Sequence, residues 1–321
     1  MDEILFNSLL NMLELDFSRF PLEKRVLYSL LVLITLLYPG QNKLQQSFVH
    51  DGPLRVYELP TIEFADYAVN DGVQAPLISA TSAIIQDVDS MSLLYAHNPD
   101  SSLLPASTTK IMTALVALDH YQLSDVLTVT VEDHSIGSTI DLAPGEKITV
   151  KNLLYGLLVG SGNDAAMTLA THFPGGYSAF VEAMNQKGAS LNLTRTKYQN
   201  PSGIDQANHS TTTRDLAILV AHALSYPVLG EIVETARIVV YDQSGEIAHV
   251  LNNTNELLGV VPGMKGFKTG WTESAGECLV SYVERNGHRI ITVVLGSRDR
   301  FGETTALIDW VFGHHTWQKL E

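Results

Sequence analysis

The residues best suited to chemistry in this sequence begin with Ser107-Thr108-Thr109-Lys110, where a serine stands three positions before a lysine. No other serine in the chain has a lysine at that spacing. Because positions i and i+3 share a helix face, the Ser107 hydroxyl and the Lys110 amine can meet. A serine hydroxyl is a weak nucleophile that needs an adjacent base, and Lys110 can be that base where burial or a second cation lowers its pKa. Alone, the pattern also fits an N-cap serine followed by a surface lysine.

A second pattern, Ser161-Gly162-Asn163, places a hydroxyl and an amide two residues apart. Such a pair can relay protons and hold a substrate carbonyl. The alternative is that Ser161 caps the helix expected to begin near Asn163. Ser190-Leu191-Asn192 has the same spacing, and we interpret it as an ordinary helix end.

A third pattern, Lys268-Thr269-Gly270, is followed by Trp271. A glycine in a strand leaves room for a ligand backbone to pair along the strand edge. The Lys268 charge and the Thr269 hydroxyl suit a substrate carboxylate, whereas the alternative is an ordinary turn after Gly266. All three patterns occur in this order, each at the boundary of an expected element, which argues against coincidence.

The elements that must position these motifs follow from hydrophobic periodicity. Helical spacing predicts helices over 107–120, 150–159, 163–172, 177–191, 212–224 and 304–312. Extended runs predict strands over 82–88, 92–97, 236–241, 247–251, 275–283 and 288–295, and Asn286-Gly287 is the strongest hairpin signal. Strands at both ends and helices between them predict an α+β fold, with an antiparallel sheet flanked by helices plus a helical lobe. We expect the site in the cleft between the lobes.

Composition excludes several classes of protein. Hydrophobic residues make up 45% of the chain and charged residues 17%, which is typical of a globular protein. The formal net charge of −15 argues against nucleic-acid binding, which needs clustered Lys and Arg. The single cysteine, Cys278, lies in an apolar strand-like run, so we expect a buried, inert thiol. The 11 histidines show no His-Glu-x-x-His pattern, and we predict no metal and no cofactor.

The N-terminal part contains an apolar run over 26–38, preceded by Lys24 and Arg25. A helix of this length spans about 20 Å, short of a hydrocarbon core of about 30 Å. Such a run is typical of an export signal, and we favour an uncleaved signal anchor over a cleaved signal; the alternative is a buried core helix. The basic pair predicts that the residues before the run stay in the cytoplasm and that the rest is extracytoplasmic.

Longer stretches around the motifs resemble the low-molecular-mass penicillin-binding proteins, the serine-type D-alanyl-D-alanine carboxypeptidases. They cover 105–113, 158–165, 200–205, 213–217 and 266–272. The resemblance implies a β-lactamase/transpeptidase-like fold for the part from about residue 80 onward. Together with the apolar run and the stretch after it, which contains Gly, Pro, Asp and Asn without clear periodicity, it gives three expected regions. These are an N-terminal signal or anchor region over 1–41, a linker over 42–80 and a penicillin-binding-type catalytic domain over 81–321. It also implies membrane attachment, where there is any, through the N-terminal segment.

The resemblance also implies roles for individual residues. Ser107 attacks the carbonyl of the penultimate D-Ala of a peptidoglycan stem peptide, and Lys110 takes its proton. The expected partners are stem peptides ending in D-Ala-D-Ala, with β-lactams as covalent inhibitors. Ser161 and Asn163 help proton transfer and hold the substrate, and Lys268 and Thr269 bind its terminal carboxylate. Gly270 allows close approach of the substrate backbone. The backbone N–H groups of Ser107 and Trp271 form the oxyanion hole. Some relatives use an arginine late in the domain to bind the substrate carboxylate. Arg298 or Arg300 can take that role here, and the equal alternative is Arg285 or a purely surface role for these arginines.

Other readings use the same residues. A class A β-lactamase needs a Glu and its water for deacylation, but neither Glu182 nor Glu256 lies in a Glu-x-x-x-Asn pattern. A DD-endopeptidase uses the same residues and differs only in which peptidoglycan substrates fit into the cleft. A catalytically dead wall-binding protein would lack an active side chain, and none is missing here.

Overall fold

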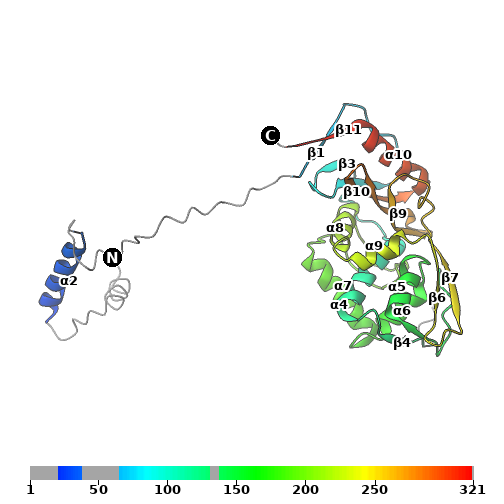
Figure 1. Ribbon diagram of the computed structural model, residues 1–321, viewed down its shortest axis with the longest axis horizontal. Coiled ribbons are helices and arrows are strands. Elements are labelled where there is room, and N and C mark those ends of the chain that lie inside the picture. The colour runs from blue at the N-terminus through cyan, green and yellow to red at the C-terminus, as the bar shows by residue number, and fades with distance from the viewer. Residues whose placement is uncertain (1–20, 38–64, 131–136, 320–321) are drawn as a thin grey trace. The chain divides into compact units, whose positions relative to one another are not determined.

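The computed structural model describes residues 21–37, 65–130 and 137–319. The chain divides into two compact units, Met1–Ile62 and Glu63–Glu321. In the first unit, α2 spans Leu22–Leu37 (Figure 1), and Val26 and Leu27 are more than half exposed. Residue 38, the end of the predicted apolar run, lies outside the described residues, as do residues 1–20.

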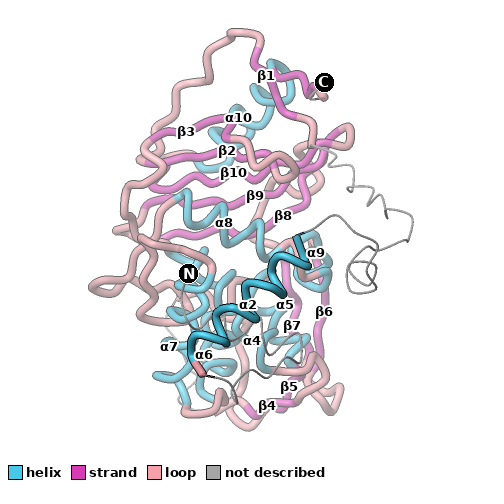
Figure 2. Tube along the Cα trace, turned by 90° about the vertical axis from the view of Figure 1, so that its left-hand side faces the viewer, coloured by secondary structure: helices cyan, strands magenta, loops and turns pink. Residues whose placement is uncertain are grey.

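The centre of the second unit is a five-stranded antiparallel sheet in the order β3-β2-β10-β9-β8 (Figure 2). Its strands are β2 Ser82–Asp87, β3 Leu93–His97, β8 Met264–Thr272, β9 Gly276–Arg285 and β10 His288–Ser297. The predicted hairpin at Asn286-Gly287 is confirmed, since both residues have positive φ, as a type I′ turn requires. β8, which carries the third motif, is an edge strand.

Helices cover both faces of this sheet and form a lobe beyond the β8 edge (Figure 2). α8 packs against β2 and β10, and α10 packs against β9 and β10. The helical elements are η1 Ala106–Thr109, α4 Lys110–His120, α5 Val150–Leu158, α6 Asn163–Thr171, α7 Gly176–Ser190, α8 Thr213–Ala223, α9 Pro227–Glu234 and α10 Arg300–His314. The predicted α+β fold with a helical lobe is confirmed.

Two hydrophobic clusters hold the layers together. One includes Met112, Leu154 and Val293 and joins the helical lobe to one sheet face. The other includes Val294 and Leu307 and joins the opposite face to α10. Because successive strand residues point to opposite faces, the neighbours Val293 and Val294 belong to different clusters.

The folded unit contains short elements that the periodicity did not predict. β1, Tyr67–Asn70, pairs with β11, His315–Gln318, so a strand lies within the range predicted as a linker. The indole Nε1 of Trp310 also donates to Val73 O at 3.0 Å. The folded unit therefore begins before residue 81, because contacts with the C-terminal end order a segment that has no periodicity of its own.

Two further two-stranded sheets flank the helical lobe. β4, Val126–Thr128, pairs with β5, Lys147–Thr149. The strands predicted over 236–241 and 247–251 are confirmed as β6, Arg237–Tyr241, and β7, Ala248–Asn252, which pair as a hairpin (Figure 1). β7 leads directly toward the third motif, which gives this hairpin a part in positioning the site.

Among the described residues, no single helix is long and apolar enough to cross a membrane. α8 and α9 pass that test only as a pair, bent by 110° at the break between them.

Candidate active site

Lys110 is the centre of the site, at the junction of η1 and α4. Its Nζ contacts the Ser107 Oγ at 2.8 Å, Asn163 Oδ1 at 2.6 Å and Ser202 O at 2.8 Å. Two of these partners are carbonyl oxygens, which can only accept. A neutral amine has two hydrogens and one lone pair, so donation to both carbonyls leaves its lone pair for the Ser107 hydroxyl.

The surroundings of Lys110 favour that neutral form. The side chain is fully buried, and burial lowers its pKa well below the ordinary value. The charge of Lys268 lowers the pKa further, while Asp164 partly opposes the change. The alternative of an N-cap serine with a surface lysine is therefore wrong, because Lys110 points inward and no side chain caps η1.

Three backbone segments meet at Ser107. A Cβ added to Gly203, where φ is +89°, would lie 1.8 Å from Ala106 O. A Cβ added to Gly270 would lie 3.0 Å from the backbone nitrogen of Ser107. Ala106 itself has φ of 48°, a left-handed conformation that non-glycine residues rarely adopt. Glycines at 203 and 270 thus let a loop and the β8 edge approach the serine.

The second motif reaches the first through Asn163, whose Oδ1 accepts from Lys110. Asn163 N donates to Ser138 O at 2.7 Å, which fixes the start of α6. Ser161 is buried, with φ of 58°. Gly162, not Ser161, is the N-cap of α6, so the capping alternative is wrong. Among the described residues, no hydrogen bond joins Ser161 to Ser107 or Lys110.

Ser190, the serine of the repeated spacing, lies at the end of α7, where its Oγ donates to Lys187 O at 2.7 Å. Its interpretation as an ordinary helix end is confirmed.

The third motif lies within β8, so the alternative of an ordinary turn is wrong. Lys268 is fully buried and its Nζ donates to Thr269 O at 2.9 Å. Burial, and then the charge of Arg300, lower the pKa of Lys268 to about 7. Trp271 follows at the end of the strand and is 63% exposed. A buried cation and an exposed aromatic ring therefore flank Thr269 and Gly270.

Of the three candidate arginines, only one reaches the motif. Arg300 Nη1 donates to Gly270 O at 3.0 Å. Arg285 instead pairs with Asp309 at 3.2 Å, and the Arg298 backbone N–H donates to Ser79 Oγ at 3.1 Å. The sequence did not decide between these arginines, because the helix was predicted to begin near 304 and not at Arg300. The Asp299 side chain caps the start of α10 by accepting from Gly302 N.

Sequence reasoning missed several groups that complete the site. The Ser202 carbonyl lies in a loop held by Asn200, whose Oδ1 accepts from Gly203 N at 2.7 Å. The stretch Asn200-Pro201-Ser202-Gly203 was visible in the sequence, but nothing in it indicated that a backbone oxygen contacts the lysine. The Thr254 hydroxyl lies 2.6 Å from the Thr269 hydroxyl, and no sequence signal marked it.

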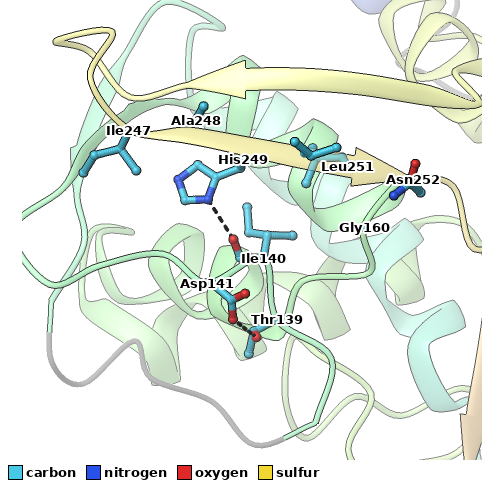
Figure 3. Close-up of a pocket in the computed structure, with 10 residues that line it drawn as sticks. Thr139, Ile140, Asp141, Gly160, Ile247, Ala248, His249, Leu251 and Asn252 are labelled. Carbon is cyan, nitrogen blue, oxygen red and sulfur yellow. Dashed lines mark hydrogen bonds between the residues drawn. The ribbon is translucent and has the colours of Figure 1, made fainter.

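A pocket of about 410 Å³ borders the second motif at Gly160, between the 139–141 segment and β7 (Figure 3). In its wall, His249 Nδ1 donates to Ile140 O at 2.8 Å, and His249 Nε2 lies 2.7 Å from Glu146 Oε1. Ile140 N in turn donates to the Asp164 carboxylate, next to Asn163. These bonds tie the hairpin to the second motif.

Cys278 is buried opposite Gly270 in the sheet register. Burial raises the pKa of its thiol to about 11. The prediction of a buried thiol is confirmed, and a thiol with a raised pKa is a poor nucleophile at neutral pH.

Comparison with known proteins agrees with this geometry. Residues 70–299 match the peptidase family S11, described as D-alanyl-D-alanine carboxypeptidase. The chain is 33% identical to the D-alanyl-D-alanine carboxypeptidase DacF of Bacillus subtilis, over 79% of this chain and 68% of that protein. It is 34% identical to the D-alanyl-D-alanine endopeptidase of Escherichia coli, over 74% of this chain and 78% of that protein.

A similar structure has been solved for the D-alanyl-D-alanine carboxypeptidase of Mycobacterium tuberculosis. It is 32% identical, with a TM-score of 0.72, and the match covers 78% of this chain and 99% of that chain. The chain therefore belongs to the D-alanyl-D-alanine carboxypeptidase family.

Proposed function

We propose that this protein removes the terminal D-Ala from peptidoglycan stem peptides through an acyl-enzyme on Ser107. The observation that carries the proposal is the environment of Lys110, a buried amine with two carbonyl acceptors and one serine hydroxyl. Activation of a serine requires an adjacent unprotonated base, and burial favours that form of Lys110 by lowering its pKa well below the ordinary value.

In the acylation step, Ser107 Oγ forms a bond to the carbonyl carbon of the penultimate D-Ala, and its hydrogen moves to Lys110 Nζ. The carbonyl electron pair moves onto oxygen, which the backbone N–H groups of Ser107 and Trp271 stabilise. The close approach of Gly270 to the Ser107 nitrogen supports this assignment. Lys268 and Thr269 hold the terminal carboxylate, with Arg300 behind them.

Collapse of the intermediate breaks the peptide bond, and the leaving amine takes a proton that Lys110 returns with Ser161 as relay. The place of Ser161, two residues before the lysine-bound Asn163, supports that role. A water oxygen then forms a bond to the ester carbonyl carbon, and its proton moves to Lys110. The bond between that carbon and Ser107 Oγ breaks, and Lys110 returns the proton to Oγ, which frees the shortened peptide as its acid.

The test is intact mass after brief exposure to benzylpenicillin, for wild type and Ser107→Ala, alongside D-Ala release from a diacyl-D-Ala-D-Ala peptide. We expect a persistent adduct in the wild type that the variant lacks, together with D-Ala release. Rapid loss of penicillin without an adduct would indicate a β-lactamase. Neither adduct nor turnover would indicate a catalytically dead protein.

A DD-endopeptidase is the second candidate, favoured by the 34% identity to the endopeptidase of Escherichia coli. Cross-linked dimeric muropeptides distinguish the two activities. Cleavage of the dimer faster than D-Ala release from the monomeric pentapeptide would reverse the order of the candidates.

We also propose that the apolar helix α2 keeps the protein at the outer face of the cytoplasmic membrane. The apolar run over 26–37 and the basic pair Lys24 and Arg25 in the first turn of α2 support this orientation. Fractionation of cells expressing the full chain tests it: a carbonate-resistant membrane fraction is expected, and a shortened product in the soluble fraction would indicate cleavage.

A further inference from the structure

Thr254, on the connection between β7 and β8, touches the segments of both the second and the third motif. Its Oγ1 lies 2.6 Å from Thr269 Oγ1. Its backbone N–H donates to Val159 O at 3.3 Å, two residues before Ser161. Thr254 is therefore the side chain that joins the connection to the third motif, while its neighbour Asn255 contacts Met264 at the start of β8.

The backbone of this connection is fixed on both sides of Thr254. Asn253 Nδ2 donates to Val233 O at 3.2 Å and to Thr235 O at 3.0 Å. Asn253 Oδ1 accepts from Asn255 N at 2.9 Å, and Asn255 is buried. With the backbone held in this way, the remaining freedom at Thr254 is the direction of its hydroxyl hydrogen.

That direction decides what Thr269 can offer a ligand. A hydroxyl carries one hydrogen, and an ionised carboxylate only accepts. If Thr269 donated to Thr254, its hydrogen would be used and a carboxylate would face only lone pairs. If Thr254 donates to Thr269, the Thr269 hydrogen is free for the carboxylate.

We propose that Thr254 is a positioning residue that donates to Thr269 Oγ1 and so directs the Thr269 hydrogen toward the terminal carboxylate of the substrate. Thr254 thereby favours peptides that end in a free carboxylate, which accepts this hydrogen bond with a full negative charge, over those that end in an amide, whose neutral carbonyl accepts it more weakly. This inference rests on the proposed function, since it takes the substrate carboxylate to lie at Thr269.

The test uses the full-length protein and two peptides, diacyl-D-Ala-D-Ala and its C-terminal amide, with product release followed by mass spectrometry. Thr254→Val keeps the shape of the side chain and removes its donor. We expect KM for the carboxylate peptide to rise about three- to tenfold, because the Thr269 hydroxyl loses the one neutral hydrogen bond that directs its hydrogen. We expect kcat to change less, and the preference for carboxylate over amide to fall by a similar factor.

Three variants separate this role from a structural one. Thr254→Ser keeps the donor and restores the wild-type preference. In a Thr269→Val background, Thr254→Val adds no further loss, because a residue that acts through another shows no effect once its partner is removed. Thr305→Val is the matched control, since that hydroxyl donates to Phe301 O within α10 and its loss leaves both peptides unaffected.

Two outcomes would overturn the inference in distinguishable ways. An active wild type whose KM and preference are unchanged by Thr254→Val, or losses that add in the double variant, overturns the role of Thr254 alone. A wild type that releases no D-Ala overturns the proposed function, and this inference with it.

Discussion

Gly270 passes so close to Ser107 that a methyl group on its Cα would lie 3.0 Å from the Ser107 backbone nitrogen. That Cβ would also lie 3.0 Å from the Cβ of Ala106 and 3.3 Å from Thr108 N. The β8 edge and η1 can therefore keep their spacing only while residue 270 has no side chain.

Gly270→Ala should separate these two segments and displace the Ser107 N–H from the oxyanion position. We expect the rate of acylation by benzylpenicillin to fall about 10²- to 10³-fold, the loss typical of one oxyanion-hole donor. Stopped-flow or mass-spectrometric acylation rates check this. Gly230→Ala is the control, because a Cβ there meets nothing within 4 Å; equal rates in Gly270→Ala and wild type would contradict the assignment.

Lys110→Arg should abolish acylation, because a guanidinium stays protonated and cannot accept the Ser107 hydrogen. Intact mass after benzylpenicillin measures the effect, and circular dichroism confirms that the variant is folded. Lys265→Arg, on the same strand as the third motif but paired with Glu234 at the surface, should acylate normally. A normal adduct in Lys110→Arg would remove Lys110 from the role of base.

The pH dependence of kcat/KM should follow the protonation state of the Lys268 amine. Its pKa is lowered to about 7, so it is charged below that pH and loses its charge above it. We expect kcat/KM for a carboxylate-ended peptide to fall as pH rises through about 7, because kcat/KM follows the free enzyme. The amide-ended peptide should lack this fall. An identical alkaline limb for both peptides would show that Lys268 does not hold the carboxylate.

Lys268 should also lower the stability of the fold. Its folded pKa lies below the unfolded value, so between about pH 7 and 10.5 the unfolded chain binds more protons. The free energy of unfolding is therefore reduced by Lys268 below about pH 7, and it increases as pH rises through this window. Lys268→Met should raise the melting temperature at pH 6 by at least about 2 °C while weakening substrate binding. A lower melting temperature would mean that the buried charge is better compensated than its surroundings indicate.

His249→Asn should destabilise the protein, because it removes the ring that contacts Glu146 Oε1 and leaves only Ala143 N on the other carboxylate oxygen. Both side chains are almost fully buried, and a buried polar group that loses its hydrogen-bond partner costs about 1–3 kcal/mol. Urea unfolding measures the change. Arg289→Gln is the control: that residue pairs with Asp89 at the surface, where a pair contributes at most about 1 kcal/mol. Equal losses would show that burial does not set the cost.

Sequence reasoning succeeded where a local pattern carries the information. The Ser107–Lys110 spacing, the Asn286-Gly287 turn and the helical periodicity of α4 are all properties of neighbouring residues. It failed where partners are distant in the chain. Nothing local says that the Ser202 carbonyl bonds to Lys110 or that Thr254 meets Thr269, and β1 forms only because β11 pairs with it.

The groups around Lys110 also determine when the serine becomes reactive. Asn163 is 53 residues from Lys110 along the chain and Ser202 is 92 residues away. In a partly folded chain, a solvated lysine keeps its ordinary high pKa and holds its proton, so the serine beside it stays inert. Reactivity is thus a property of completed long-range contacts, and the protein remains latent until the helical lobe and the β8 edge have closed around the lysine.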